Sequence, residues 1–344
     1  MTPAQLRACY GPLDAYAGAR LVTLGDGGER GVRVIELRSG GGLDLEVVVD
    51  RGFDLGRLAI DGRTVSWHAA HGLRAPWLND AHAGRGQGFL RANSGFLVTG
   101  GYDHIRQPET DRLDASPLHP HADVDYPLHG DGTGQPARLI GYGLEEEADA
   151  PYLWAEGEVI QSMTFRGALR FRRRLEMPLG GTGFTLTDRV TNIGPTAMTH
   201  MLLYHFNLGY PLVAEGTVLD AGDARVSWQG APHDPLAAFA APRVALNADL
   251  SIFTQPAGRL PSATVTSPDG LALTLGVDPA QLPFLQVLRM EGQGLYGMAL
   301  EPCTTGTRSR ADARARGQMI VLQPGDHRDY RLEISLAASS RPGA

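Results

Sequence analysis

Residues 201–211 read MLLYHFNLGYP, and their chemical character alternates from one position to the next. Successive side chains of a β-strand point to opposite faces of the sheet. The first face is wholly apolar and consists of Leu202, Tyr204, Phe206 and Leu208. The second face places His205 and Asn207 beside Met201 and Leu203. The pattern predicts a strand that anchors a core on one side and presents a proton-transfer group and an amide on the other.

Residues 296–302, YGMALEP, repeat this design with a carboxylate. Tyr296, Met298 and Leu300 share one face, and Glu301 shares the other with Gly297 and Ala299. Because its neighbours on that face are so small, we expect open space beside Glu301 that a ligand can fill. The alternative interpretation of both strands is that their polar groups are hydrogen-bonded core residues.

The composition predicts an all-β fold in a single domain that covers residues 1–344, with antiparallel strands and few short helices. The 44 glycines, 23 prolines and many short alternating segments favour strands and turns. One helix is expected at residues 2–10, with Thr2 as N-cap and Pro3 in the first turn. The predicted strands are Val32–Leu37, Leu43–Val49, Leu55–Ile60, Ala137–Tyr142, Trp154–Phe165, Leu169–Glu176, Phe184–Val190, Leu271–Val277 and Tyr330–Leu336. Two long loops are expected at Gln107–Asp125 and Gly222–Asp249.

Charge and targeting features narrow the class of protein. The 31 basic and 38 acidic residues give a net charge of -7, which argues against a nucleic-acid partner. No apolar run approaches the roughly 18 residues that span a bilayer, and residues 1–7 lack the apolar core of a signal peptide. We therefore expect a cytoplasmic protein without a membrane partner. Cys9 and Cys303 lack the spacing of a zinc or redox motif, and Cys303 is interpreted as a small core residue.

Three further segments carry candidate functional residues. His129 precedes Gly130 after a predicted strand, a junction where histidines commonly face a cleft. Asp103 and His104 follow the strand and glycine pair at residues 96–101, where Asp103 could orient an imidazole or His104 could cap the turn. Arg51 ends an apolar strand, where its planar guanidinium could hold a substrate hydroxyl or pair with an aspartate inside a turn.

Histidine and carboxylate side chains also allow a metal-site interpretation. A divalent ion bound by His104, His129, His205 and Glu301 would make the protein a metal-assisted enzyme. The spacing of these residues gives the metal site no specific support, so the main prediction contains no cofactor.

The motifs together resemble the aldose 1-epimerase, or galactose mutarotase, superfamily. Leu128-His129-Gly130, Tyr204–Leu208 and Leu300-Glu301-Pro302 occur in the order of that superfamily. The closer resemblance is to a bacterial branch classed as a domain of unknown function. The further phrases that match this branch are Asp50-Arg51-Gly52, Phe96–Thr99 with Asp103-His104, Tyr126–Gly130 and His200–Pro211. The resemblance covers roughly residues 30 to 337.

The resemblance implies a β-supersandwich with a sugar-binding cleft across one sheet. It also implies an isomerase in which a glutamate, here Glu301, removes the proton of the anomeric hydroxyl while a histidine protonates the ring oxygen. We expect His205 as the acid, with His129 touching the substrate or sharing that role. Arg51, Asp103, His104 and Asn207 are the expected substrate contacts.

One position departs from the familiar mutarotases. When Phe206-Asn207-Leu208 are aligned with the motif that follows the catalytic histidine, Leu203 falls at the position of that histidine. His205 lies two residues further along the same face, roughly 6.6–7 Å away. The expected function is a sugar mutarotase or epimerase with a small-molecule sugar as its partner, as a monomer or homodimer. A metal-assisted epimerase or isomerase of a ketose or oxidised sugar, and a non-catalytic carbohydrate-binding protein, are the alternatives.

Overall fold

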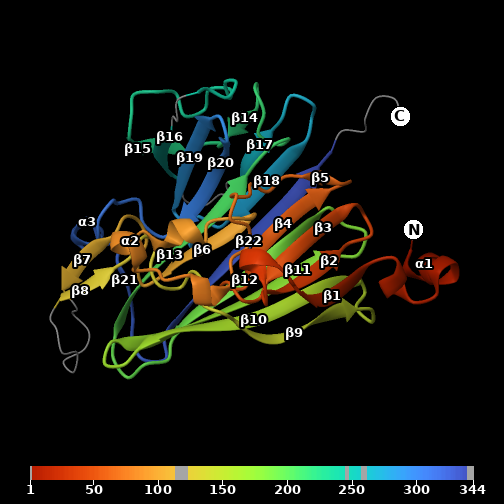
Figure 1. Cartoon of the computed structure of the whole chain (residues 1–344), viewed down its shortest axis with the longest axis horizontal. Coiled ribbons are helices and arrows are strands. Elements are labelled where there is room, and N and C mark those ends of the chain that lie inside the picture. The colour runs from red at the N-terminus through yellow and green to blue at the C-terminus, as the bar shows by residue number, and fades with distance from the viewer. Residues whose placement is uncertain (1, 113–122, 245–247, 257–261, 339–344) are drawn as a thin grey trace.

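The computed structural model describes residues 2–112, 123–244, 248–256 and 262–338. In these residues most of the regular structure is antiparallel β-sheet, as the composition predicts (Figure 1). The helices are short: α1 (Pro3–Tyr10), α2 (Ala83–Gly86), α3 (Arg310–Ala315) and the 3₁₀ turns Leu13–Ala15, Gly27–Glu29, Pro76–Leu78 and Gly88–Arg91. The predicted cap is confirmed, because the Thr2 side chain accepts from the backbone of Gln5 and Pro3 occupies the first turn. No described helix is long and apolar enough to cross a membrane.

The larger sheet positions the candidate site. In the described part of the chain it has twelve strands, of which ten form a continuous series. In spatial order the series is β1 (Gly18–Thr23), β2 (Arg33–Arg38), β3 (Leu43–Val48), β4 (Asp54–Ile60), β6 (Leu97–Tyr102), β13 (Met198–Leu208), β20 (Leu295–Cys303), β19 (Phe284–Gly292), β16 (Ala248–Thr254) and β15 (Arg225–Gln229). Two short strands join it, β5 (Arg63–Thr64) on β4 and β21 (Ile320–Leu322) on β13. The strand with which the sequence analysis began, β13, thus lies in the middle of the sheet.

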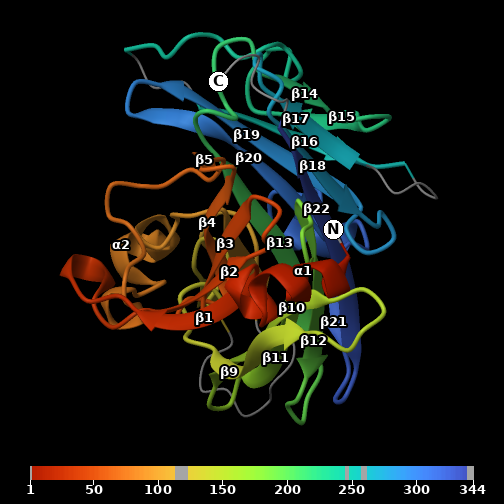
Figure 2. The same ribbon diagram turned by 90° about the vertical axis from the view of Figure 1, so that its right-hand side faces the viewer.

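The second sheet contains eight described strands and covers one face of the first. Its spatial order is β14 (Val218–Asp220), β17 (Ser262–Thr266), β18 (Ala272–Val277), β22 (His327–Ala337), β12 (Gly183–Asn192), β11 (Gly167–Pro178), β10 (Tyr152–Met163) and β9 (Arg138–Glu145). The two sheets lie against each other (Figure 2). One hydrophobic core cluster contains side chains from both sheets. Two packed antiparallel sheets are the β-supersandwich that the resemblance implied.

The predicted strand faces are confirmed. Leu202, Tyr204, Phe206 and Leu208 all belong to the core between the sheets. In β20, Met298 and Leu300 are in this core and Tyr296 packs against it. The other face of β13 places Met201 and Leu203 in a separate small cluster with Cys303, outside the core between the sheets. Cys303 is therefore a buried packing residue, as expected from the sequence.

A buried ionic network joins the two sheets across the core. Arg173 of β11 donates to Asp188 of β12 at 2.7 Å and to Asp54 of β4 at 3.3 Å. Tyr204 of β13 donates to the same Asp188 at 2.8 Å. The side chains of Arg173, Asp188 and Asp54 are fully buried. Such a charge is tolerated in a core only when its partners surround it, so the network fixes how β11 and β12 sit on β4 and β13.

The two predicted long loops are partly wrong. Residues 107–125 contain β7 (Glu109–Arg112) and most of β8 (Asp123–Tyr126), which pair as a separate two-stranded sheet. Residues 113–122 lie outside the described residues. Residues 222–249 contain β15 and the start of β16, with residues 245–247 also outside the description. The sequence pattern did not reveal these strands, because β7 and β15 bury few apolar side chains and so lack an apolar face.

Candidate active site

Strand pairing places the candidate residues in one row across the larger sheet. His205 of β13 faces Val98 of β6, and Glu301 of β20 faces Gln286 of β19. The register between β13 and β20 runs through the pairs Leu203–Cys303 and Phe206–Leu300, which brings His205 opposite Glu301. Cross-strand partners point to the same face of a sheet. The row lies on the face away from the core between the sheets.

His205 and Glu301 are in direct contact. Nε2 of His205 lies 3.4 Å from Oε1 of Glu301, and the side chains are 5% and 1% exposed. The amide of Gln286 donates a hydrogen bond to Oε2 of Glu301. Burial raises the pKa of Glu301 above the usual glutamate range, while His205, Arg106 and Gln286 hold it down. A carboxylate with a raised pKa is a stronger base than one in water.

His129 joins this pair from a turn. It follows Leu128 with φ of +55°, and its ring lies 6.0 Å from the ring of His205, measured between centroids. Phe89 packs against both imidazoles, with centroid distances of 4.7 Å to His129 and 5.7 Å to His205. Burial lowers the pKa of His129 well below the usual histidine range, and His205 and Arg106 lower it further. His129 is therefore neutral at pH 7.

The position of His129 depends on Gly100. A Cβ added to Gly100 of β6 would lie 2.8 Å from Cβ of His129, closer than two such atoms approach. The backbone N–H of Gly101 also donates to the carbonyl of His129 at 2.7 Å. The glycine pair at the end of β6 thus lets the turn with His129 lie against the strand.

Arg106 was missed by the sequence analysis, although it belongs to this site. Its backbone N–H donates to Nδ1 of His129 at 3.3 Å, and the N–H of His129 donates back to its carbonyl at 2.9 Å. The bond to Nδ1 leaves the proton of neutral His129 on Nε2. Arg106 itself has φ of +90°, a conformation that an L-residue rarely adopts and that costs on the order of 1–3 kcal/mol. Only the unusual density of charged residues at 103–106 hinted at its role in the sequence.

Asn207 links the row to the segment that carries Phe89. Its amide donates to Oδ1 of Asn93 at 3.1 Å and to the carbonyl of Gly95 at 3.0 Å. The 3₁₀ turn Gly88–Arg91, which contains Phe89, ends just before Asn93. Asn207 therefore helps to hold Phe89 above the two histidines, which is a positioning contact.

Arg51 lies elsewhere and is engaged with the backbone. Its guanidinium donates to the carbonyls of Ala92, Ser94 and Leu97, and its Nε lies 3.7 Å from Asp54. The side chain is 1% exposed. The alternative that we gave for Arg51, a pair with an aspartate inside a turn, describes this arrangement, and no donor of Arg51 is brought to the His205–Glu301 pair.

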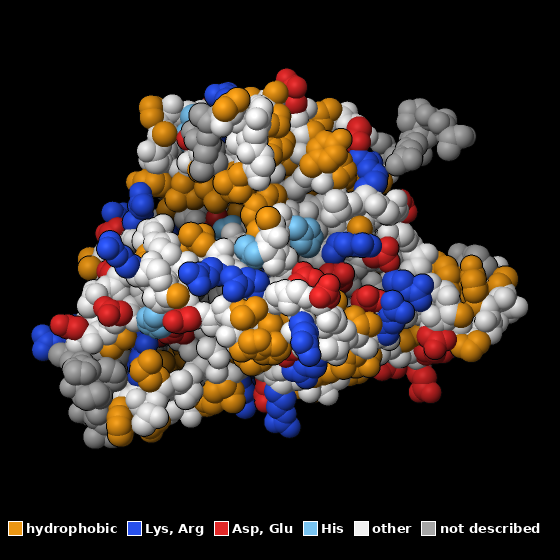
Figure 3. All heavy atoms as spheres, viewed as in Figure 1, with side chains coloured by type: hydrophobic (Ala, Val, Ile, Leu, Met, Phe, Trp, Pro, Cys, Tyr) orange, Lys and Arg blue, Asp and Glu red, His pale blue; other side chains and the backbone are white. Residues whose placement is uncertain are grey.

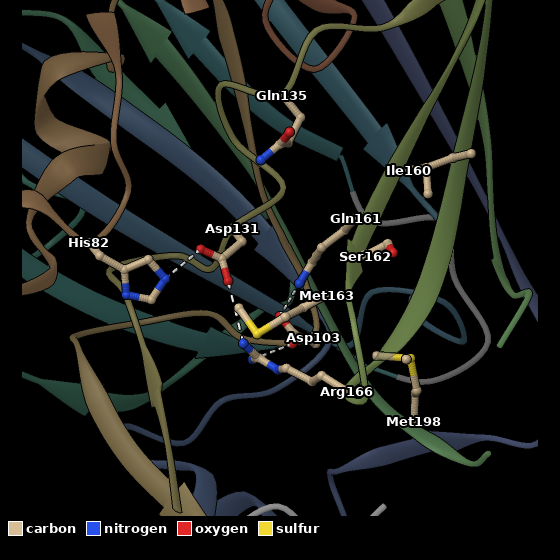
Figure 4. A pocket seen from close by; sticks show the side chains of 11 residues that line it. His82, Asp103, Asp131, Gln135, Ile160, Gln161, Ser162, Met163, Arg166 and Met198 are labelled. Atoms are coloured by element: carbon tan, nitrogen blue, oxygen red, sulfur yellow. Dashed lines mark hydrogen bonds and ion pairs between the residues drawn. The ribbon is translucent and has the colours of Figure 1, made fainter. Parts of the chain in front are cut away.

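Asp103 and His104 also make their hydrogen bonds with residues other than His205 and Glu301. Asp103 accepts from Arg166 and from Gln161, both at 2.8 Å, and lines a separate pocket of about 210 Å³ with Asp131 and His82 (Figure 4). Asp103 thus orients a guanidinium rather than an imidazole. Nε2 of His104 is bonded to the carbonyl of Gln107 at 2.9 Å, and burial lowers its pKa to about 4.

The space beside Glu301 differs from the prediction at one end. A Cβ at Gly297 would lie 3.1 Å from Cδ1 of Trp67, so the indole of Trp67 occupies the place that we expected to be open. Ala299 separates Gly297 from Glu301 on this face.

Four buried polar atoms around the pair have no hydrogen bond from any described residue. They are Nδ1 of His205, Oε1 of Glu301, Oε1 of Gln286 and Nη1 of Arg106. Buried polar groups are nearly always hydrogen-bonded, so such a cluster indicates a place for a polar ligand or water. Figure 3 shows a hollow below a band of hydrophobic side chains, with histidine and acidic side chains inside it.

The four residues of the metal-site alternative are not grouped as metal ligands in the described structure. Within the ranges that the structure describes, no three His, Cys, Asp or Glu side chains are grouped so as to hold a metal ion. Two of the four proposed ligands already use a ring nitrogen, since His104 is bonded to Gln107 and His129 to Arg106.

Solved structures with the same fold were found by comparison of coordinates. A protein from Klebsiella pneumoniae subsp. pneumoniae MGH 78578, assigned provisionally as an aldose 1-epimerase, is 20% identical with a TM-score of 0.82, over 93% of this chain and 83% of that one. A galactose mutarotase-like protein from Clostridium acetobutylicum is 11% identical with a TM-score of 0.62, over 93% and 98% of the two chains. A galactose 1-epimerase from Lactobacillus acidophilus NCFM is 14% identical with a TM-score of 0.58, over 94% and 99%.

Sequence comparison adds the family. No curated protein matches the chain by sequence. Residues 29–336 match the family described as Domain of unknown function (DUF4432), which is close to the extent expected from the motifs. The chain therefore belongs to the DUF4432 family, and it shares its fold with solved structures described as aldose 1-epimerase or galactose mutarotase-like.

Proposed function

We propose that the protein is a sugar mutarotase, or a closely related sugar epimerase, in which Glu301 is the general base and His205 the general acid. The observation that carries this proposal is the 3.4 Å contact between Nε2 of His205 and Oε1 of Glu301. Anomer exchange needs an acid and a base at two oxygens bound to one carbon, so the two groups must be close neighbours.

The reaction follows from this arrangement. Glu301 takes the proton of the anomeric hydroxyl. The oxygen of that hydroxyl then forms a double bond to the anomeric carbon. The bond from that carbon to the ring oxygen breaks, and the ring oxygen takes a proton from His205. The open-chain aldehyde rotates and closes from its other face, with both protons returned. General acid–base help is typically worth roughly 10²–10⁴-fold in rate for each group.

The surroundings supply what each group needs. Burial raises the pKa of Glu301, which strengthens it as a base. His129 is neutral and carries its proton on Nε2, so it can donate a hydrogen bond to a substrate oxygen without a charge. Phe89 covers both imidazoles and limits the access of water. The names of the similar structures, aldose 1-epimerase and galactose 1-epimerase, support an isomerase of the same class.

Polarimetry on a panel of freshly dissolved aldoses tests this function. We expect faster anomer exchange for at least one sugar, unchanged by a chelator, and a bell-shaped dependence of kcat/KM on pH. If the anomers of no sugar in the panel exchanged faster than in buffer, the proposed mutarotase function would be refuted. Stoichiometric metal in the purified protein, lost together with activity on chelation, would replace it by the metal-assisted alternative. Saturable sugar binding without any change of anomer or product would indicate a binding protein.

A further inference from the structure

Arg106 is held rigidly beside the acid–base pair. Its Nε donates to the carbonyl of Thr307 at 3.1 Å, and its Nη2 donates to the carbonyl of Thr305 at 2.7 Å and to Sγ of Cys303 at 3.4 Å. Cys303 and Glu301 alternate along β20 and so point to the same face of the sheet. These contacts place the guanidinium next to the carboxylate of Glu301 along that face.

Among the residues that the structure describes, none forms an ion pair with the charge of Arg106. Its hydrogen bonds within the described residues go to two carbonyls and a thiol, and the residue is only 6% exposed. Its Nη1 is buried and makes no hydrogen bond with any described residue. Leaving a buried charged donor unpaired costs more free energy than leaving a neutral donor unpaired. A ligand that accepts a hydrogen bond would complete this donor.

The unpaired atoms of the site complement each other. Nη1 of Arg106 is a donor that lacks an acceptor, and Oε1 of Glu301 is an acceptor that lacks a hydrogen bond. A hydroxyl group satisfies both at once, because its proton is donated to Glu301 while its oxygen accepts from Arg106. A carboxylate or a carbonyl oxygen would satisfy Arg106 alone.

We propose that Nη1 of Arg106 binds the anomeric oxygen and stabilises the negative charge that develops on it while Glu301 removes its proton. This role rests on the proposed function and adds a catalytic group to it. The O–H bond breaks, its proton goes to Glu301, and its electron pair forms the new double bond to carbon as the ring opens. A preorganised donor aimed at a developing oxyanion is worth about 10²–10³-fold in kcat.

The backbone around Arg106 supports a catalytic role. Arg106 and His129 both have positive φ, and the backbone N–H of each donates to the other residue: to Nδ1 of His129 and to the carbonyl of Arg106. The strained pair therefore fixes two site residues together. Arginine suits the position better than lysine, because three of its donors are used as anchors while Nη1, on the same rigid plane, is left for a ligand.

The test compares Arg106→Gln, Arg106→Lys and the wild type in kcat and in the pH dependence of kcat/KM. In Arg106→Gln we expect kcat to fall about 10²–10³-fold. Loss of the cation also raises the pKa of Glu301, so the acidic limb should move to higher pH. Arg106→Lys keeps the charge, so the acidic limb of its kcat/KM profile should stay near that of the wild type while kcat still falls. Millimolar guanidinium should restore part of the activity of Arg106→Ala.

Thr307→Ala is the matched control for a purely structural role. It removes the bonds from Oγ1 of Thr307 to Thr305 and Ser309, at 2.9 and 3.2 Å, and so loosens the segment that anchors Arg106 without changing charge. We expect lower stability and an unmoved acidic limb.

The outcomes separate this role from the proposed function. A folded Arg106→Gln protein with kcat within about threefold of wild type and an unmoved limb would overturn the role of Arg106 alone. If Arg106→Gln does not fold, an Arg106→Lys protein with wild-type kcat overturns it equally. A wild type that is inactive on every sugar refutes the proposed function and this role together.

Discussion

Gln286 of β19 and Glu301 of β20 are direct cross-strand partners, and the amide of Gln286 donates its hydrogen bond to Oε2 of Glu301. The bond favours the charged form of the carboxylate and so opposes burial, which raises its pKa. It also turns Oε1 toward His205. Gln286 therefore prepares Glu301 both in charge and in orientation.

Gln286→Leu tests this preparation. The variant removes a hydrogen bond to a charged group, which raises the pKa of Glu301 and moves the acidic limb of kcat/KM to higher pH. At a pH on that limb we expect about a tenfold loss, which corresponds to the ~1.5 kcal/mol of such a bond. Unchanged pH dependence in a folded, active variant would show that Gln286 does not control Glu301.

Glu301→Gln and His205→Ala should each lose roughly 10²–10⁴-fold in kcat, because each removes one proton-transfer group. Both should keep the wild-type circular dichroism spectrum. His327→Ala, which removes an exposed histidine of β22 far from the row, is the control and should keep full activity. Near-normal turnover in either of the first two variants would remove that residue from the mechanism.

Arg173→Ala should destabilise the fold by about 3–5 kcal/mol, because Asp188 and Asp54 would be left charged and buried without their partner. The control is Arg189→Ala on β12, whose pair with Asp329 is on the surface. Exposed pairs are worth about 0–1 kcal/mol. Urea unfolding of the two variants measures the difference, and equal losses would contradict the structural importance of the buried network.

Stability should fall as the pH drops from about 6.5 to about 4. His200 donates from Nδ1 to the carbonyl of Tyr102 and accepts at Nε2 from Tyr330, and burial lowers its pKa to about 4. In this pH range the unfolded chain binds a proton at His200 that the folded chain does not, so unfolding becomes easier. The contribution of His200 is roughly 3 kcal/mol over the whole range.

His200→Gln checks that assignment. Glutamine offers one donor and one acceptor but does not titrate, so the difference in unfolding free energy between pH 5 and pH 7 should be smaller than in the wild type. If the pH dependence were the same in both proteins, other groups would be responsible, including His104 and His129.

The sequence predicted the sandwich because its central strands alternate strictly. In β13 and β20 the apolar positions that we assigned to the core are buried between the sheets or pack against that core. Some strands were missed. β7 and β15 bury too little apolar surface for alternation to show. β19, which lies beside β20 inside the larger sheet, was also not predicted. Pairing order across the sheet depends on contacts between distant segments, which no local pattern reports.

The sequence predicted the positions of those candidate residues whose location depends only on the face of the strand that carries them. His205 and Glu301 meet because each occupies the outward face of a neighbouring strand. Arg51 and Asp103 were assigned from residue type and from the family resemblance, and the structure engages both with internal partners. Arg106 could not be found in this way, because its place depends on a turn with positive φ and on carbonyls about 200 residues further along the chain.

The most direct test of the account is exchange spectroscopy by NMR on the α and β anomeric protons of an equilibrated aldose. We predict that the wild type produces exchange cross-peaks between the two anomers of its sugar, and that Glu301→Gln at the same concentration reduces the exchange rate at least 100-fold, a loss of roughly the size expected for one proton-transfer group. Exchange at the wild-type rate in Glu301→Gln, or no exchange by the wild type with any aldose, would contradict the account.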